Sequence, residues 1–227
     1  MITVDLGSSS LRELNSALHA IKPNTNETHW VVQNPRGQHS IAVGIDAPIT
    51  VEVQGHAGYY CAGMNKQARV IIHGNAGQGV AENMMSGRVH VRGDASQAAG
   101  ASGRGGLLVI DGNASARCGL SMKGIDIVVR GSVGHLSAFM AQTGSLVVLG
   151  DAGEALGDSI YESRLYVRGK VHSLGADCIE KEMTPEHMDH LRALLKAAEA
   201  DADVADFRRY GSARKLYHFH IDNVGAY

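Results

Sequence analysis

The chain has 227 residues, and its 21 lysines and arginines against 23 acidic residues leave a formal charge of −2, which argues against a nucleic-acid or anionic-lipid partner. No stretch reaches the roughly 18 apolar residues of a membrane span, and the first ten residues carry no leader pattern, so a cytoplasmic protein is predicted. The three cysteines, Cys61, Cys118 and Cys178, are too far apart for a disulfide framework, a zinc knuckle or an iron–sulfur site, whereas the 28 glycines, well above the usual share of about 7%, indicate a repeated backbone feature.

Residues 1–48 are predicted to form an N-terminal cap. Three serines, Ser8 to Ser10, precede leucines at helical spacing, which predicts a capped amphipathic helix over residues 9–20. Residues 30–32 and 41–43 have the composition of short strands that begin a sheet.

Residues 49–183 repeat with a period of 19. Two and four positions before each repeating glycine the residue is always aliphatic, and because the side chains of a strand alternate, both columns are expected to point inward. The glycines are Gly55, Gly74, Gly93, Gly112, Gly131, Gly150 and Gly169. The aliphatic residues are Val53, Ile72, Val91, Ile110, Val129, Val148 and Val167, and Val51, Val70, Val89, Leu108, Ile127, Leu146 and Leu165.

A tight corner is predicted after each glycine. We expect the glycine to adopt a positive φ there, because the next residue is usually a turn former and small residues follow it. The residues directly after the glycines are His56, Asn75, Asp94, Asn113, Ser132, Asp151 and Lys170.

One strand and several small-residue corners per repeat predict an all-β fold, a single-stranded right-handed parallel β-helix of about seven 19-residue coils with short helical N- and C-terminal caps. A leucine-rich repeat would need a Leu-x-x-Leu-x-Leu frame with an asparagine ladder, and a calcium-binding nonapeptide would need an acidic residue about every nine positions. Neither pattern is present.

Residues 184–227 are predicted to form a C-terminal helix and tail. Thr184, Pro185 and Glu186 make a helix start, with the threonine as cap and the proline in the first turn. A β-helix exposes unpaired strand edges at both ends, so the two terminal segments are expected to cover them.

An apolar stripe is predicted on the outer face. Val109, Val128 and Val147 fall in the outward column of three adjacent coils, with Leu149 nearby. Such a stripe is usually covered by a partner or by the chain's own termini, and the sequence leaves both readings open.

Carboxylates are candidates for catalysis, because polysaccharide-cleaving β-helices line an outer groove with them. Asp94 and Asp151 share a column three coils apart, about 14 Å, beyond the roughly 5 to 9.5 Å that separates a glycosidase pair. Asp94, Asp111 and Asp126 can lie nearer one another, but Asp is expected at turns, so a structural role is favoured.

Twelve histidines raise the question of a metal site. No pair adds a third ligand at a fixed spacing, so solvated surface residues are predicted instead. The pairs are His187 with His190 on the predicted helix, His218 with His220 at alternating positions of a predicted strand, and His73 with His90 on neighbouring coils.

Three further features are interpreted as structural or left open. Residues 74–79 look like a nucleotide loop, but another strand follows them instead of the helix that a phosphate site needs. Cys61 and Cys118 lie three coils apart and are interpreted as buried fillers. The basic cluster at residues 208–215 either docks an acidic partner surface or covers the end of the β-helix.

The repeat pattern G-x-x-G-x-x-x-G, seen at residues 112–119 with Ser115 in the middle place, resembles the β-helix domain that ends the large subunit of glutamate synthase. The resemblance covers roughly residues 30 to 180. A free-standing domain with added terminal segments is similar to the third subunit of N-methylglutamate synthase (methylamine–glutamate N-methyltransferase), and the tail around residues 208–219 adds to the match. The β-helix subunit of formylmethanofuran dehydrogenase is similar too.

The resemblance implies a scaffold subunit of an enzyme complex, with no catalytic, cofactor-binding or metal-binding residue in this chain. It implies a hetero-oligomer with an amidotransferase-like subunit and a synthase-like subunit that carries FMN and an iron–sulfur cluster. Together they would convert methylamine and glutamate to N-methylglutamate and ammonia. The alternatives are a β-helix subunit of another complex and, on fold analogy alone, a carbohydrate-active enzyme.

Overall fold

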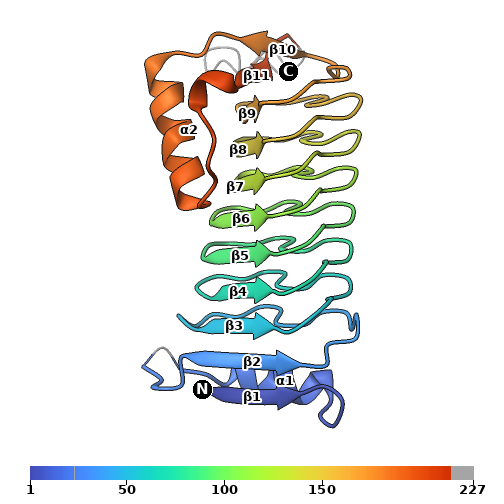
Figure 1. The fold of residues 1–227 in the computed structure, drawn as a ribbon, viewed down its shortest axis with the longest axis vertical. Coiled ribbons are helices and arrows are strands. Elements are labelled where there is room, and N and C mark those ends of the chain that lie inside the picture. The colour runs from blue at the N-terminus through green and yellow to red at the C-terminus, as the bar shows by residue number, and fades with distance from the viewer. Residues whose placement is uncertain (23, 216–227) are drawn as a thin grey trace, which may run out of the picture.

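The structure is a computed structural model that describes residues 1–22 and 24–215. It is a β-solenoid, in which one sheet of eleven strands runs through the described chain in the order β1-β2-β3-β4-β5-β6-β7-β8-β9-β11-β10 (Figure 1). Neighbouring strands from β1 to β9 are parallel, because the chain passes once around the solenoid between them. The predicted parallel β-helix is confirmed.

The repeats stack with an offset of 19 residues, so that Val51 pairs with Val70 and Val70 with Val89. A second line of single parallel bridges joins the small residues two positions after each turn glycine, beginning with Ala57 and Ala76. The strands of the stack are β2 (His29–Gln33), β3 (Thr50–Val53), β4 (Arg69–Ile72), β5 (Arg88–Val91), β6 (Leu107–Ile110), β7 (Lys123–Val129), β8 (Thr143–Val148) and β9 (Arg164–Val167).

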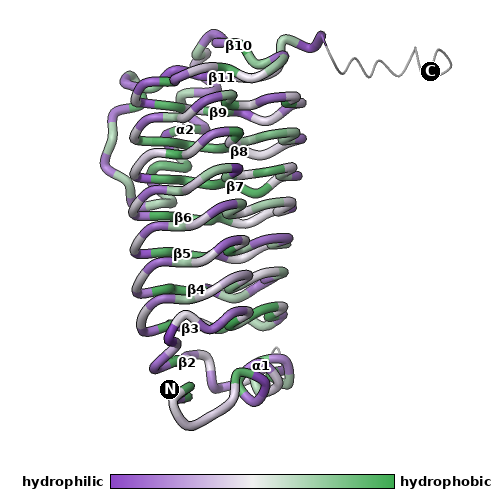
Figure 2. The backbone as a smooth tube through the Cα atoms, turned by 90° about the vertical axis from the view of Figure 1, so that its right-hand side faces the viewer, coloured by the Kyte–Doolittle hydropathy of each residue, from purple (hydrophilic) through white to green (hydrophobic). Residues whose placement is uncertain are grey.

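The two aliphatic columns fill the interior, as predicted. Every residue of both columns is fully buried, and together they form the spine of one continuous apolar cluster. Cys61 and Cys118 are fully buried in the same cluster, which confirms that they are fillers. Seen from the side in Figure 2, the coils lie one above another at even spacing.

The turn glycines serve a purpose other than the predicted one. Of the seven, only Gly55 has a positive φ. At Gly74 an added Cβ would lie 2.8 Å from the carbonyl carbon of Gly55 in the preceding coil, which is too close for any side chain. The column therefore needs glycine because successive coils touch there.

Left-handed backbone occurs elsewhere in six of the seven coils, at five, seven and nine residues after the turn glycine. Tyr60, Ala62 and Met64 have φ of 59°, 55° and 55°, and the same positions are left-handed in the next five coils. This conformation costs roughly 1 to 2 kcal/mol for a non-glycine residue. Hydrogen bonds between coils, such as Ala62 N–H to the carbonyl of Ile41 at 2.9 Å, offset the cost.

The N-terminal end is closed by β1 (Ile2–Asp5) and α1 (Leu11–His19). The helix predicted over residues 9–20 is present but begins at Leu11, with Ser10 and Glu13 in a reciprocal capping box, and it buries Leu14 and Leu18. Residues 30–32 lie in β2, as predicted, whereas β1 has no counterpart among the predicted elements.

The strand predicted at residues 41–43 is wrong, because these residues form a turn in which Ala42 has a φ of 56°. Asn15 of α1 provides hydrogen bonds to the backbone of this turn. Its side chain donates to the Ser40 carbonyl at 2.8 Å and accepts from the Ala42 N–H at 3.1 Å. The prediction failed because Ile41 and Ala42 are fully buried, and buried residues of a turn are as apolar as those of a strand.

The C-terminal end is closed by β11 (Arg208–Ser212), which pairs antiparallel with β9, and by β10 (Cys178–Lys181), which pairs antiparallel with β11. The residues of the basic cluster that lie in β11 therefore cover the end of the solenoid, which is one of the two roles that the sequence left open. β10 falls inside the segment 49–183 assigned to repeats, but it has left the repeat register.

Helix α2 (Pro185–Ala197) starts where predicted but does not cover the end. It lies along the outer face of the sheet beside β7 to β9, followed by the 3-10 helix η1 (Val204–Asp206) (Figure 1). Its leucines pack on the outward apolar stripe, so that stripe is covered by the chain's own C-terminal segment. This outer cluster consists of Val109, Val128, Val147, Leu149, Tyr166, Leu191, Leu194, Leu195, Ala198 and Phe207.

Candidate functional site

Asp94 and Asp151 belong to a polar ladder that ties the coils together. The side chain after each turn glycine accepts the backbone N–H of the equivalent residue one coil on, so Asn113 N–H donates to Asp94 Oδ1 and Lys170 N–H to Asp151 Oδ1, both at 2.7 Å. Asn75 and Ser132 act in the same way. These carboxylates stabilise the stacking of adjacent coils, which agrees with the structural role predicted for them.

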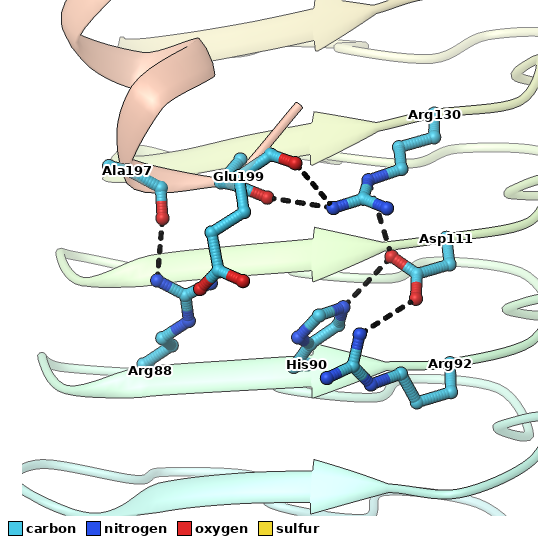
Figure 3. Close-up of polar contacts among 8 residues, drawn as sticks. Arg88, His90, Arg92, Asp111, Arg130, Ala197 and Glu199 are labelled. Atoms are coloured by element: carbon cyan, nitrogen blue, oxygen red, sulfur yellow. Dashed lines mark hydrogen bonds and ion pairs between the residues drawn. The ribbon is translucent and has the colours of Figure 1, made fainter. Parts of the chain in front are cut away.

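Asp111 is the centre of a charged cluster at the ends of β5 to β7 (Figure 3). Its Oδ1 lies 2.8 Å from His90 Nε2 and 3.4 Å from Arg130 Nε, and its Oδ2 lies 3.3 Å from Arg92. Burial lowers the pKa of His90, whose side chain is 1% exposed. Burial also opposes ionisation of Asp111, but the hydrogen bond from His90 and the charge of Arg130 keep the pKa of that carboxyl below its usual value.

Arginines next to this cluster hold the end of α2, as Figure 3 shows. One amino group of Arg130 donates to the carbonyls of Ala198 and Glu199 at 3.0 Å, and Arg88 donates to the carbonyl of Ala197 at 2.6 Å. The last carbonyls of a helix have no partner within it and carry partial negative charge. The charged cluster therefore fastens α2 to the sheet.

The three candidate carboxylates are not brought together as a catalytic set. Asp126 pairs with Leu107, four residues before Asp111, so Asp111 and Asp126 stand about 13 Å apart along the strand direction. That separation exceeds the roughly 5 to 9.5 Å of a glycosidase pair. Asp94 and Asp111 are each engaged by the contacts described above.

Of the histidine pairs considered from the sequence, one is separated in the structure and one is brought together. His73 Nε2 lies 2.8 Å from Glu52, whereas His90 binds Asp111, so the two belong to different contacts. His187 and His190 do share a face of α2 and line one pocket. His218 and His220 lie outside the described residues. Among residues 1–22 and 24–215, no group of three histidine, cysteine or carboxylate side chains is placed to hold a metal ion.

A pocket of about 560 Å³ opens on the outer face of the sheet beside the first half of α2. Along one side, Asp126 of β7, Ser145 of β8 and Arg164 of β9 stack in register. His190 of α2 and Arg209 of β11 face it from two other directions. Volumes of this size are typical of sites for small molecules.

The pocket contains a serine, a histidine and an aspartate, but not in the order of a nucleophilic triad. Ser145 Oγ lies 2.9 Å from His190 Nε2, and Asp126 also bonds to Ser145. Burial raises the pKa of Asp126, against the lowering effects of Ser145 and His190. A triad would need the carboxylate on the second nitrogen of the imidazole, and no hydrogen bond joins Asp126 to His190 in the described structure.

The pocket joins residues that the sequence suggested separately, namely Asp126, His187, His190 and the basic cluster, with others that it did not suggest. Ser145, Ser163 and Arg164 were missed. A signal for Ser145 and Arg164 exists, because the column five residues before each turn glycine should point outward and is mostly polar from Thr50 to Arg164. Lys181 comes from β10, which lies outside the repeat register, so periodicity carries no signal for it.

The three cysteines are free and buried. Burial raises the pKa of each thiol to about 12, so none is suited to act as a nucleophile or metal ligand. Residues 74–79 continue from the turn into the next coil without a helix, which agrees with their structural interpretation. Among the described residues no helix has both the length and the apolar composition needed to cross a membrane.

The fold and these contacts define a β-solenoid protein with capped ends, a side helix and a polar pocket beside that helix. A comparison with known proteins identifies its relatives. Protein GlxC of Rhizobium meliloti (strain 1021) is 63% identical over 228 residues, which span the whole of both chains. The chain belongs to the GlxC family. No family model and no solved structure matches it.

Proposed function

We propose that this chain is the β-solenoid scaffold subunit of a glutamate-synthase-like enzyme assembled from separate chains. The observation that carries the proposal is the unbroken stack of 19-residue coils, since this is the repeat that resembles the domain at the end of the glutamate synthase large subunit. A stack with a fully buried, close-packed interior is stiff, which suits a spacer that keeps two partner centres apart.

Within that class we assign the chain to an N-methylglutamate synthase, which transfers methylamine to glutamate and releases ammonia. The partners would be an amidotransferase-like subunit and a synthase-like subunit, and the latter would carry FMN and an iron–sulfur cluster. This chain would contribute position and no reacting group.

An exposed apolar surface on the first repeat supports partner docking. Tyr59, Tyr60 and Met64, within residues 59–64 of the first repeat, each expose two fifths or more of their area. The ring of Tyr59 stacks on that of His39 with a centroid distance of 4.3 Å, so the surface is also ordered. Aromatic and methionine side chains are enriched where proteins meet.

The test is purification of the tagged chain from its native host. We expect two larger chains to accompany it in fixed ratio, with the absorbance of a flavin, bound iron, and conversion of methylamine and glutamate to N-methylglutamate. Recovery of the chain alone and fully stable would contradict a scaffold role. Recovery with a different set of enzyme subunits would retain the scaffold role and overturn the specific assignment.

A matched pair of variants sharpens this test. Tyr59→Ser removes an exposed ring, whereas Gln78→Ser changes the equivalent residue one coil on. We expect the first to weaken assembly and the second to leave it unchanged, with equal melting temperatures. Equal assembly of both variants would exclude residues 59–64 as the docking surface.

A further inference from the structure

The pocket beneath α2 carries an inference that does not depend on the proposed function. We propose that it binds a small organic carboxylate, held by the guanidinium groups of Arg164 and Arg209. Arg164 is the first residue of β9 and Arg209 lies in β11, and both line the pocket.

Two of the guanidinium groups in the wall have donors to spare. Arg209 donates through Nε to the carbonyl of Glu182 at 2.8 Å, and none of its terminal amino groups pairs with a carboxylate of the described residues. Among the carboxylates of the described residues, Arg164 reaches only Glu186, at 3.9 Å, whose side chain is 80% exposed. The third arginine, Arg214, is occupied by Glu162 at 2.8 Å.

The charges of the wall favour a bound anion. Arg164 and Arg209 lie on the outer face of paired strands and repel each other, and burial together with the charge of Arg164 lowers the pKa of Arg209. An anion between them would relieve this repulsion. Carboxylates fit guanidinium groups particularly well, because two parallel N–H donors match two oxygens.

The other residues of the pocket favour binding of an organic carboxylate over binding of a compact dianion such as phosphate. Asp126 stands two coils from Arg164, about 10 Å along the stack, and its negative charge opposes a second negative charge close by. Ser145 and His190 lie between and offer hydrogen bonds to a polar group. The volume of about 560 Å³ leaves room for a carbon skeleton behind the carboxylate.

The experiment titrates the full chain with four probes by calorimetry: glutarate, butyrate, inorganic phosphate and butylamine. We expect the two carboxylates to bind and butylamine not to bind. Arg209→Gln should weaken glutarate binding roughly tenfold or more, because a charge-assisted hydrogen bond is lost.

Arg208→Gln is the matched control. Arg208 directly precedes Arg209 in β11 and points to the opposite face of the strand. Its side chain is 70% exposed, so its loss should leave binding unchanged. Arg164→Gln serves as a second test should Arg209→Gln fold poorly, as judged by its far-ultraviolet spectrum. The proposal is overturned by no binding of either carboxylate, by binding of phosphate alone, or by equal losses in Arg209→Gln and Arg208→Gln.

Discussion

Two apolar clusters hold this molecule together, and they are built by different rules. The interior cluster passes through every repeat and uses the same two positions of each 19-residue unit. The outer cluster covers only β6 to β9 and joins strand residues to a helix that follows the repeats. The interior cluster therefore makes the solenoid, whereas the outer cluster attaches one helix to it.

A charge placed in each cluster at neighbouring positions should have the largest and most different effects. Val128 and Val129 are both fully buried, the first under α2 and the second in the interior. We expect Val129→Asp to lower the free energy of unfolding by at least about 3 kcal/mol, because an unpaired carboxylate would be buried between coils. Val128→Asp should release α2 and leave the strands folded.

Chemical denaturation followed by circular dichroism measures the first effect, and limited proteolysis near η1 measures the second. A Val129→Asp protein that melts with the wild type would contradict the inward orientation of this column. Global unfolding of Val128→Asp would show that α2 and the solenoid form one cooperative unit.

A milder change separates the helix from the solenoid by packing alone. Leu191 is fully buried against the outer stripe, and Leu191→Ala should weaken docking of α2 by about 2 to 4 kcal/mol through the cavity it leaves. Hydrogen exchange should then accelerate at the amides of α2 but not at those of β5. Arg192→Ala, at an exposed neighbouring position, is the control and should leave exchange in α2 unchanged.

The arginine contacts to the end of α2 should contribute less. Arg130→Gln removes the charged donor to the carbonyls of Ala198 and Glu199 and should weaken docking of the helix by about 1 to 2 kcal/mol, since the site is partly exposed. Arg92→Gln is the comparison, because Arg92 contacts Asp111 but not the helix. Equal effects of the two variants on exchange in α2 would argue that the ion pair with Asp111 matters more than the helix carbonyls.

A pH dependence should be the smallest effect. Burial lowers the pKa of His90 below the value it has when unfolded, so the unfolded chain binds this proton more readily. The stability associated with neutral His90 is thus complete above the unfolded pKa of about 6.5 and is lost as the pH falls through the folded pKa. Denaturation midpoints between pH 7 and pH 5 should fall more for the wild type than for His90→Gln, and parallel curves would exclude His90 as their cause.

The interior could be predicted from the sequence because it is periodic. Seven glycines in one register fix which residues stack, and the alternation of a strand then fixes which of them point inward. The role of the glycines was predicted for the wrong reason, since close contact between coils does not leave a signal different from that of a turn. The alternating left-handed residues, such as Tyr60 and Ala62, were missed because non-glycine residues rarely adopt that backbone conformation.

The pocket and the outer cluster were harder to predict because they depend on where α2 and β11 come to lie. Val109, Val128 and Val147 indicated that something covers the sheet, but nothing in their spacing distinguishes a partner from the chain's own helix. His190 meets Ser145 only because α2 folds back along the side of the stack. Contacts of this kind follow from the direction of a connection, which a repeat does not encode.

The reversal of chain direction at β11 gives the solenoid a defined stop. Each added 19-residue unit would lengthen it by about 4.8 Å, whereas the antiparallel pair β11 and β10 presents an edge that no parallel coil of a second copy can continue in register. The solenoid thus has a fixed length, set by its number of coils. The distance between molecules bound at its two ends could change only in steps of one coil, by insertion or deletion of whole repeats.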